Sequence, residues 1–280
     1  MSQQSARGFE DLDLRPSGRL SPRKRARVTR GVQYVVLLAA VAAILASVNW
    51  TLMREKIFTL EAIRNAAPNI PHAFGNTLLY TLGAFGVSLT LGTVLALMKL
   101  SSVKVYRWLA TAYIEFFRGL PALLIVFAVA YGLPMTLGVR IPSLFLKAAI
   151  ALGVVSSAYM AESLRAGIQA VPKGQVEAAR SLGMTHSKAL IHVVFPQAIR
   201  IVLPPVTNEI ILLTKDTSLV YVAGMTLAEW ELSKLARESL AEPVGGLTAL
   251  FAIGALYLVI TLPLGFVVRR LEKSFGKAKA

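Results

Sequence analysis

The chain contains no cysteine and few acidic residues, 15 against 30 basic ones in 280 residues. The missing thiols exclude disulfide scaffolds, thiolate zinc sites, iron–sulfur clusters and cysteine nucleophiles. Charged residues make up only 16% of the chain and hydrophobic ones 55%, whereas an ordinary soluble domain has about 25% and 45–50%. The composition argues against a soluble globular protein. A net charge of +15 suggests nucleic acid, but a nucleic-acid-binding domain would not be this apolar, so we expect no nucleic-acid partner.

Long runs without ionisable side chains predict helices that cross a membrane. About 20 residues of helix span a hydrocarbon core, and backbone groups in lipid must bond within their own segment. We therefore predict an all-α polytopic membrane protein with six transmembrane helices. In chain order they are Val32–Trp50, Phe74–Met98, Gly119–Val139, Leu144–Leu164, Val193–Val222 and Pro243–Val268. The fourth and fifth carry isolated charges, and the other four are uncharged.

The basic residues are distributed unevenly between the two sides of these six helices. With the N-terminus inside, 21 of the 30 fall on the inner side and seven on the outer side, and Arg118 and Lys215 lie within spans. The span that contains Arg118 is taken to start near Trp108, before its uncharged part. This bias predicts that both termini are cytoplasmic. Most of the excess positive charge is therefore an orientation signal.

The inner loop between the fourth and fifth predicted spans has the marks of a short helix. Pro172 opens it, good helix formers follow, and Gly183 closes it. Thr185 or Ser187 is expected to cap a second helix. On physical grounds alone the segment is an ordinary surface helix between two spans.

The residues of this loop support a more specific interpretation. Glu177-Ala178-Ala179, followed by Gly183 and then by Val193–Pro196, resembles the EAA loop of ABC importer permeases. The similarity to the polar amino acid branch, which includes histidine, glutamine, glutamate, arginine and opine permeases, extends from about Phe74 to Val268. It is also carried by the segments Tyr113–Pro121, Ala158–Gln169, Asn208-Glu209 and Lys215–Leu219.

The resemblance implies a type I ABC importer permease fold in a bacterial cytoplasmic (inner) membrane. In this family Glu177, Ala178, Ala179 and Gly183 would belong to a coupling helix that docks on an ATPase subunit. The other implied partners are a second permease subunit, identical or paralogous, an extracytoplasmic solute-binding protein and a polar amino acid substrate. The chain has no phosphate-binding loop. We therefore expect it to be a transport subunit and not an enzyme, to bind no cofactor, and to leave ATP–Mg to the partner.

The resulting organisation has five segments. They are a disordered basic cytoplasmic tail (1–30), an extra transmembrane helix (31–53), an external linker (54–73), the permease core (74–271, with the coupling loop at 166–193) and a cytoplasmic C-terminal tail (272–280). Two features depart from the family pattern. Such permeases commonly have five spans, and Leu120 stands where the family often has threonine.

Charged residues within the predicted spans are the candidates for a substrate pathway, because a charge at bilayer depth costs at least ~2.5–3.5 kcal/mol and normally faces a partner or water. Glu115 precedes Arg118 by three residues, so the two are expected to pair, either to fix helix packing or to line the path. Glu209 is expected near mid-membrane, in a helix kinked or broken at Pro204-Pro205. Lys215 and Asp216 follow, and pair locally or line the same path.

Two other functions remain to be weighed. An ion-coupled secondary amino acid transporter could use Glu115 and Glu209, but it would normally show an internal repeat, and none is found. A membrane-embedded enzyme would need a His/Asp or metal constellation within the spans. His72, His186 and His192 fall in or near loops without metal-ligand spacing, so we expect no metal site.

Overall fold

The computed structural model describes residues 22–57, 59–242 and 246–276, and the part described is almost entirely helical, with no strand. By its internal contacts the chain forms two compact units, Met1–Arg54 and Glu55–Ala280. Each unit is considered by itself below.

The first unit contains α1 (Pro22–Ser47) and the start of α2 (Trp50–Ile57). The predicted span Val32–Trp50 lies mainly in α1. Helix begins already at Pro22, so the prediction of a disordered tail is wrong for residues 22–30, and residues 1–21 lie outside the described part. The apolar stretch Ala26–Ser47 has none of its residues buried, which is suited to a helix surrounded by lipid.

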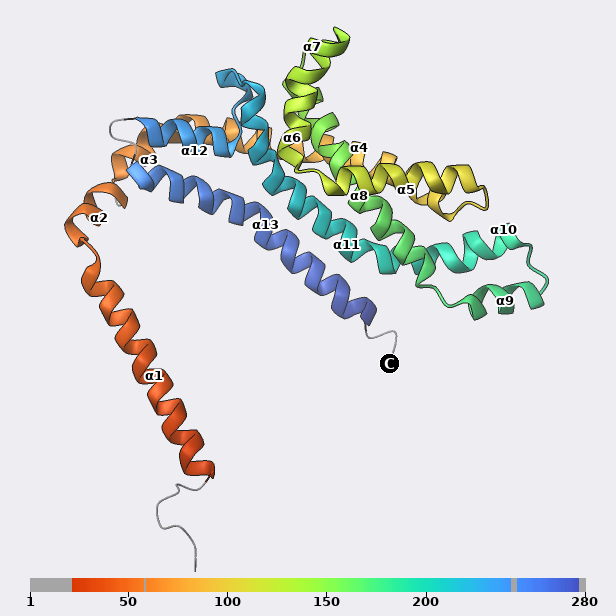
Figure 1. The fold of residues 1–280 in the computed structure, drawn as a ribbon, viewed down its shortest axis with the longest axis horizontal. Helices are drawn as coiled ribbons and strands as arrows, with labels where there is room; N and C mark the ends of the chain where they lie inside the picture. The colour runs from red at the N-terminus through yellow and green to blue at the C-terminus, as the bar shows by residue number, and fades with distance from the viewer. Residues whose placement is uncertain (1–21, 58, 243–245, 277–280) are drawn as a thin grey trace, which may run out of the picture. The chain divides into compact units, whose positions relative to one another are not determined.

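The second unit is a set of long helices joined by short ones (Figure 1). Residues 54–73, predicted as a linker, are largely helical, and α13 continues to Gly276, so helix extends into the predicted C-terminal tail (272–280). The elements are α3 (Leu60–Ala66), η1 (Ala67–Asn69), α4 (Ile70–Leu100), α5 (Lys104–Gly119), α6 (Ala122–Phe127), η2 (Ala128–Gly132), α7 (Leu133–Leu137), α8 (Leu144–Gln169), α9 (Lys173–Ser181), α10 (His186–Ala189), η3 (Leu190–Val194), α11 (Phe195–Asp216), η4 (Thr217–Ala223), η5 (Leu227–Glu229), α12 (Leu232–Ala241) and α13 (Gly246–Gly276).

Within the described residues, five stretches of helix are long and apolar enough to cross a membrane, and a bent pair of helices brings the number to six. This agrees with the six predicted spans. The five stretches are Ala26–Ser47, Trp50–Leu100, Leu144–Gln169, His186–Ala223 and Leu247–Ser274.

The third span along the chain is broken, although the sequence analysis expected one continuous helix over Gly119–Val139. The helices Lys104–Gly119 and Ala122–Leu137 meet at an angle of 103°. Pro121 accounts for the break, because a proline forces the preceding residue out of the helical region. Leu120 is accordingly extended, with φ −106° and ψ 141°.

Close packing of α4 against α8 forms the centre of the second unit. A Cβ on Gly153 of α8 would lie 2.6 Å from the Val87 Cβ and 2.9 Å from the Ala84 carbonyl oxygen of α4, so the two backbones approach too closely for any larger residue. Two-thirds of the residues in the most apolar part of α8 are buried, against 17% for the stretch that contains α11 and 17% for α13. Helix α8 is therefore the packed core of the unit.

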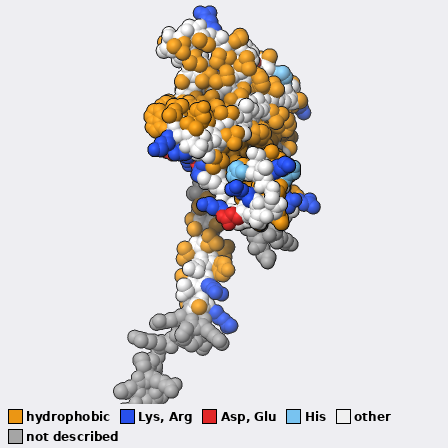
Figure 2. Space-filling view, turned by 90° about the vertical axis from the view of Figure 1, so that its right-hand side faces the viewer, with side chains coloured by type: hydrophobic (Ala, Val, Ile, Leu, Met, Phe, Trp, Pro, Cys, Tyr) orange, Lys and Arg blue, Asp and Glu red, His pale blue; other side chains and the backbone are white. Residues whose placement is uncertain are grey.

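Helix α11 runs unbroken from Phe195 to Asp216 through Pro204 and Pro205, so of the kink or break predicted at the proline pair a break is not found. The α9–α10 hairpin joins the end of α8 to the start of α11, and α12 lies at the opposite end of the unit (Figure 1). On the face that carries α5, α9 and α10, a broad hydrophobic surface gives way to basic and histidine side chains towards the hairpin end (Figure 2).

Candidate functional site

The α9–α10 hairpin has the form that its sequence predicts. Helix α9 begins after Pro172, and Gly183, with φ +84°, reverses the chain behind it. The amide N–H groups of Gly183 and Met184 donate to the carbonyls of Arg180 and Ala179 at 3.0 and 3.2 Å. A side chain with a Cβ rarely adopts so positive a φ, so glycine suits this turn.

One face of α9 is turned outward. Glu177 and Ala178 are exposed, Ala179 is buried, and Leu182 just beyond the helix is 85% exposed. The hydroxyl of Thr185 accepts the backbone N–H of Lys188 at 3.3 Å and caps α10, which is one of the two caps expected. The hairpin thus has an exposed surface of small residues with one projecting leucine, Leu182.

A cavity of about 380 Å³ lies where three elements of the second unit meet. The break between α5 and α6 contributes Leu120, Pro121 and Ala122 to its lining. Helix α8 contributes Val155, Ser156 and Tyr159, and α11 contributes Glu209, Leu212 and Asp216. Pro121, which breaks the third span, therefore also shapes the cavity wall.

Glu209 is the deepest charged group of this cavity, with 8% of its surface exposed. Its carboxylate accepts the hydroxyl of Ser156 at 2.5 Å, and Ser156 is in turn hydrogen-bonded to Ser88 at 2.8 Å. These three residues come from α11, α8 and α4, so a chain of hydrogen bonds joins the three helices across the cavity floor. One hydroxyl donor leaves most of the acceptor capacity of a carboxylate available to a ligand.

Asp216 lies seven residues after Glu209, two turns along the same face of α11, and lines the same cavity. The guanidinium of Arg118, in the last turn of α5, lies 5.4 Å above the ring of Tyr159, which is part of the cavity wall. The site thus has two carboxylates on α11 and, beside the cavity wall, a guanidinium from α5. Such a set can bind a positive and a negative group of one small molecule.

The other predicted pathway residues lie elsewhere. Glu115 and Lys215 are exposed and do not line this cavity. Among the described side chains no ion pair joins Glu115 to Arg118 or Lys215 to Asp216, so the predicted pairing of Glu115 with Arg118 is not found. The guanidinium of Arg118 lies over the ring of Tyr159 instead.

A second buried carboxylate, Glu231, was missed by the sequence analysis. Glu231 caps α12 and is fully buried. It accepts the backbone N–H groups of Ser233 at 2.6 Å and Lys234 at 2.7 Å, and the hydroxyl of Tyr257 at 2.9 Å. Burial raises the pKa of this carboxyl, and the hydrogen bonds from Ser233, Lys234 and Tyr257 oppose that rise.

No group of three or more His, Cys, Asp or Glu side chains with metal-binding geometry occurs in the part of the chain that the structure describes. Ser156 and Tyr159 are further residues that the sequence analysis missed. A polar Ser156-Ser157 pair in a helix otherwise rich in Ala and Gly is the signal that was available.

Comparison with known proteins identifies clear relatives. A protein-family model described as "Binding-protein-dependent transport system inner membrane component" matches residues 88–277. The "Probable glutamine ABC transporter permease protein GlnM" of Bacillus subtilis is 40% identical over 206 residues, covering 73% of this chain and 92% of that protein. The "Arginine transport system permease protein ArtQ" of the same organism is 37% identical over 187 residues, covering 67% and 83%.

A solved structure supports the same relationship. The crystal structure of an amino acid ABC transporter with histidines matches with a TM-score of 0.69 and 38% sequence identity, and the match covers 77% of this chain and 98% of that chain. The methionine ABC transporter MetNI in an inward-facing conformation matches with a TM-score of 0.57 at 18% identity, which is similarity of fold alone.

Proposed function

The chain belongs to the family of binding-protein-dependent transport system inner membrane components, and from that premise we propose that it is the transmembrane permease subunit of an ATP-driven ABC importer for polar amino acids. Relatives named for glutamine and arginine transport support this substrate class. Its predicted place is a bacterial cytoplasmic membrane, with both termini and the α9–α10 hairpin on the cytoplasmic side.

One observation carries the coupling proposal. The hairpin joins α8 to α11, and these two helices also supply Ser156, Tyr159, Glu209 and Asp216 to the cavity. A partner ATPase that binds the exposed face of α9 therefore acts on the two helices that form the site. Helices transmit such a displacement over their length because their packed interiors do not deform continuously. ATP and Mg²⁺ belong to the partner.

The cavity chemistry supports an amino acid as the transported molecule. A zwitterionic amino acid carries an ammonium group, which Glu209 and Asp216 would attract, and a carboxylate, which Arg118 would attract. A guanidinium or amide side chain would extend into the remaining space. An external solute-binding protein would deliver this molecule. The sparsely buried helices α11 and α13 leave surface for a second permease subunit.

The coupling role is tested by two changes in the hairpin. Gly183→Val places a β-branched residue at φ +84°, a backbone conformation such residues avoid, and Glu177→Lys reverses the charge on the exposed face of α9. We expect either change to abolish ATP-dependent uptake of radiolabelled glutamine, arginine or glutamate while the chain still inserts into the membrane. Lys188→Gln, an exposed change on α10, is the matched control and should transport normally. Full uptake in either hairpin variant would contradict the coupling role.

Uptake into proteoliposomes that contain the purified chain distinguishes the alternative, an ion-coupled secondary transporter. The importer needs its ATPase subunit and ATP, and it is indifferent to ionophores that collapse proton or sodium gradients. Uptake by the chain alone that follows an ion gradient would instead favour secondary transport.

A further inference from the structure

A second pocket, of about 440 Å³, lies at the hairpin end of the second unit, away from the Glu209 cavity. It is bounded by the end of α4, the start of α5 and the end of α8. Its lining is strongly basic and has one large aromatic side chain: Lys99, Lys104, Arg107, Trp108, Thr111, Arg165 and Gln169. Neither the proposed transport path nor the coupling face of α9 uses these residues.

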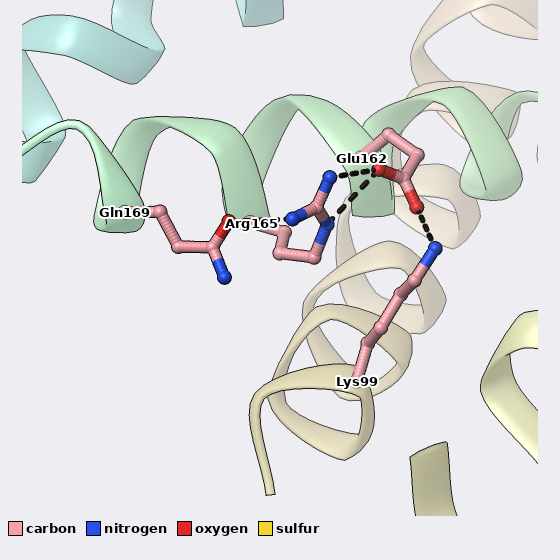
Figure 3. Close-up of polar contacts among 4 residues, drawn as sticks. All are labelled: Lys99, Glu162, Arg165 and Gln169. Carbon is pink, nitrogen blue, oxygen red and sulfur yellow. Dashed lines mark hydrogen bonds and ion pairs between the residues drawn. The ribbon is translucent and has the colours of Figure 1, made fainter. Parts of the chain in front are cut away.

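The cations of this pocket are only partly neutralised. Glu162 pairs with Lys99 and, at 2.7 Å, with Arg165 (Figure 3). Arg165 also donates to the side-chain carbonyl of Gln169 at 2.5 Å. One carboxylate therefore fixes two cations and cancels a single charge. Two cationic side chains thus face the pocket from α4 and α8 in fixed positions.

The remaining two cations come from α5. Arg107 donates to the backbone carbonyls of Ser101 and Ser102 at 2.8 and 2.9 Å, which are neutral groups that orient it without cancelling its charge. The side chain of Lys104 makes no hydrogen bond or ion pair with any described residue. With four cations against Glu162, the pocket keeps an excess of about three positive charges, which calls for an anionic ligand.

The surroundings of the pocket indicate where that anion comes from. Trp108 is 69% exposed, and Val105 and Leu109 beside it on α5 are exposed as well. Tryptophan is enriched where a membrane protein meets the headgroup layer. A basic pocket that opens onto an apolar, tryptophan-bearing helix surface can hold a phosphate while hydrocarbon lies against the neighbouring helix.

We propose that this pocket binds the headgroup of an anionic phospholipid. The phosphate is held by the cations Lys99, Lys104, Arg107 and Arg165, and the glycerol end of the acyl chains lies beside Trp108. The site lies in the cytoplasmic leaflet if the proposed orientation holds. Basic pockets between helices on this side of a membrane are suited to anionic lipid headgroups, and arginine gives a planar, bidentate contact to phosphate.

The proposal is tested by native mass spectrometry of the complete transporter, purified in detergent and titrated with phosphatidylglycerol or phosphatidylcholine of the same acyl chains. We expect the wild type to bind phosphatidylglycerol preferentially. Each surface cation contributes about 1 kcal/mol to anionic-lipid attraction. Lys104→Gln with Arg107→Gln should therefore weaken phosphatidylglycerol binding about thirtyfold and leave phosphatidylcholine binding unchanged.

Two further variants guard against trivial explanations. Lys104→Gln alone removes no described contact and should weaken binding about fivefold, which covers the possibility that losing Arg107 disturbs the turn at Ser101. Arg270→Gln with Lys273→Gln removes two exposed cations from the end of α13 and should change nothing.

Three results would overturn the proposal. The first is equal affinity of the wild type for the two lipids. The second is full phosphatidylglycerol affinity in the pocket variants, which would indicate a protein partner as the ligand of the basic pocket. Displacement of the lipid by inorganic phosphate alone would make this a phosphate site. Because lipid binding is read without transport, a failure of the transport proposal would leave this measurement unaffected.

Discussion

Glu209 and Glu231 are both buried carboxylates, but their surroundings differ in kind. Glu231 is enclosed at the start of α12 and accepts two backbone N–H groups and the Tyr257 hydroxyl. Glu209 accepts one hydroxyl, from Ser156, and its remaining acceptor capacity faces a cavity of about 380 Å³ that also holds Asp216. Burial alone therefore does not separate a structural carboxylate from one available to a ligand.

What separates them is the number of donors already supplied by the protein. A carboxylate accepts about four hydrogen bonds, and burying it without donors is costly. At Glu231 the protein supplies those donors itself, which fixes the entrance to α12. At Glu209 it leaves them to be supplied by the contents of the cavity. The four predictions below test this distinction.

The largest expected effect is on stability at Glu231. Glu231→Ala removes the cap of α12 and leaves the backbone N–H groups of the half-buried residues Ser233 and Lys234 without their acceptor, so we expect a loss of about 3 kcal/mol in the free energy of unfolding. Thermal unfolding of the detergent-solubilised chain, followed by tryptophan fluorescence, measures it. Glu231→Gln keeps one acceptor oxygen and should lose less, and Glu242→Ala, exposed after α12, should lose almost nothing. A stable Glu231→Ala protein would remove the distinction.

The next effect is on transport at Glu209. Glu209→Gln keeps the size of the side chain and an acceptor for Ser156 but removes the charge. We expect uptake at limiting substrate to fall at least about tenfold, equivalent to about 1.4 kcal/mol, with the unfolding midpoint almost unchanged. Glu115→Gln, exposed outside the cavity, is the comparison and should transport normally. Normal uptake by Glu209→Gln would mean that Glu209 also has a structural role only.

A smaller effect is expected at Ser156. Ser156→Ala removes the one donor to Glu209 and the partner of Ser88, which we expect to cost about 0.5–1.5 kcal/mol of stability. Uptake should change by less than it does in Glu209→Gln, because the carboxylate and its charge remain. Parallel uptake and unfolding measurements on the two variants decide this. A larger transport loss in Ser156→Ala would make the hydroxyl the more important group.

The smallest effect is a pH dependence at Glu231, because its hydrogen bonds oppose the effect of burial. Burial raises the pKa of Glu231 above its ordinary value of about 4.5, so the folded protein holds the proton more tightly than the unfolded chain does. The stability that this group contributes is then full below that ordinary value and decreases as the pH rises through the raised pKa. Hydrogen exchange of α12 at a series of pH values measures it. Glu231→Gln should lack this component, and an identical profile would contradict it.

The sequence predicted the features that depend on local pattern. Runs without ionisable residues located the spans, and Pro172 with Gly183 bounded α9, because a proline and a glycine act on their own turn. The coupling role proposed for that helix came from family resemblance and not from physical pattern. The resemblance also led to Glu177 and its neighbours as the candidate docking surface.

Features that depend on packing between distant segments could not be predicted in the same way. Pro121 broke a helix, yet Pro204 and Pro205 did not, because the surroundings decide whether a proline's missing hydrogen bond is tolerated. The pairing of Glu162 with Lys99 joins residues 63 positions apart, and the enclosure of Glu231 depends on Tyr257. Hydrophobic periodicity indicates which face of a helix is buried, but it does not indicate which side chain of another helix will meet it.

The hydrogen bonds from Ser88 through Ser156 to Glu209 have a direction. A hydroxyl has a single proton, so Ser156, which donates to Glu209, must accept from Ser88. Ser88 differs in this from Thr77, Thr81, Thr90 and Thr93 of the same helix, whose hydroxyls each donate to the carbonyl four residues earlier. If a proton or a cation occupies the carboxylate, this order is free to reverse. The direction of these hydrogen bonds therefore depends on whether the Glu209 carboxylate is occupied, and hydroxyl vibrational spectra with and without substrate would report it.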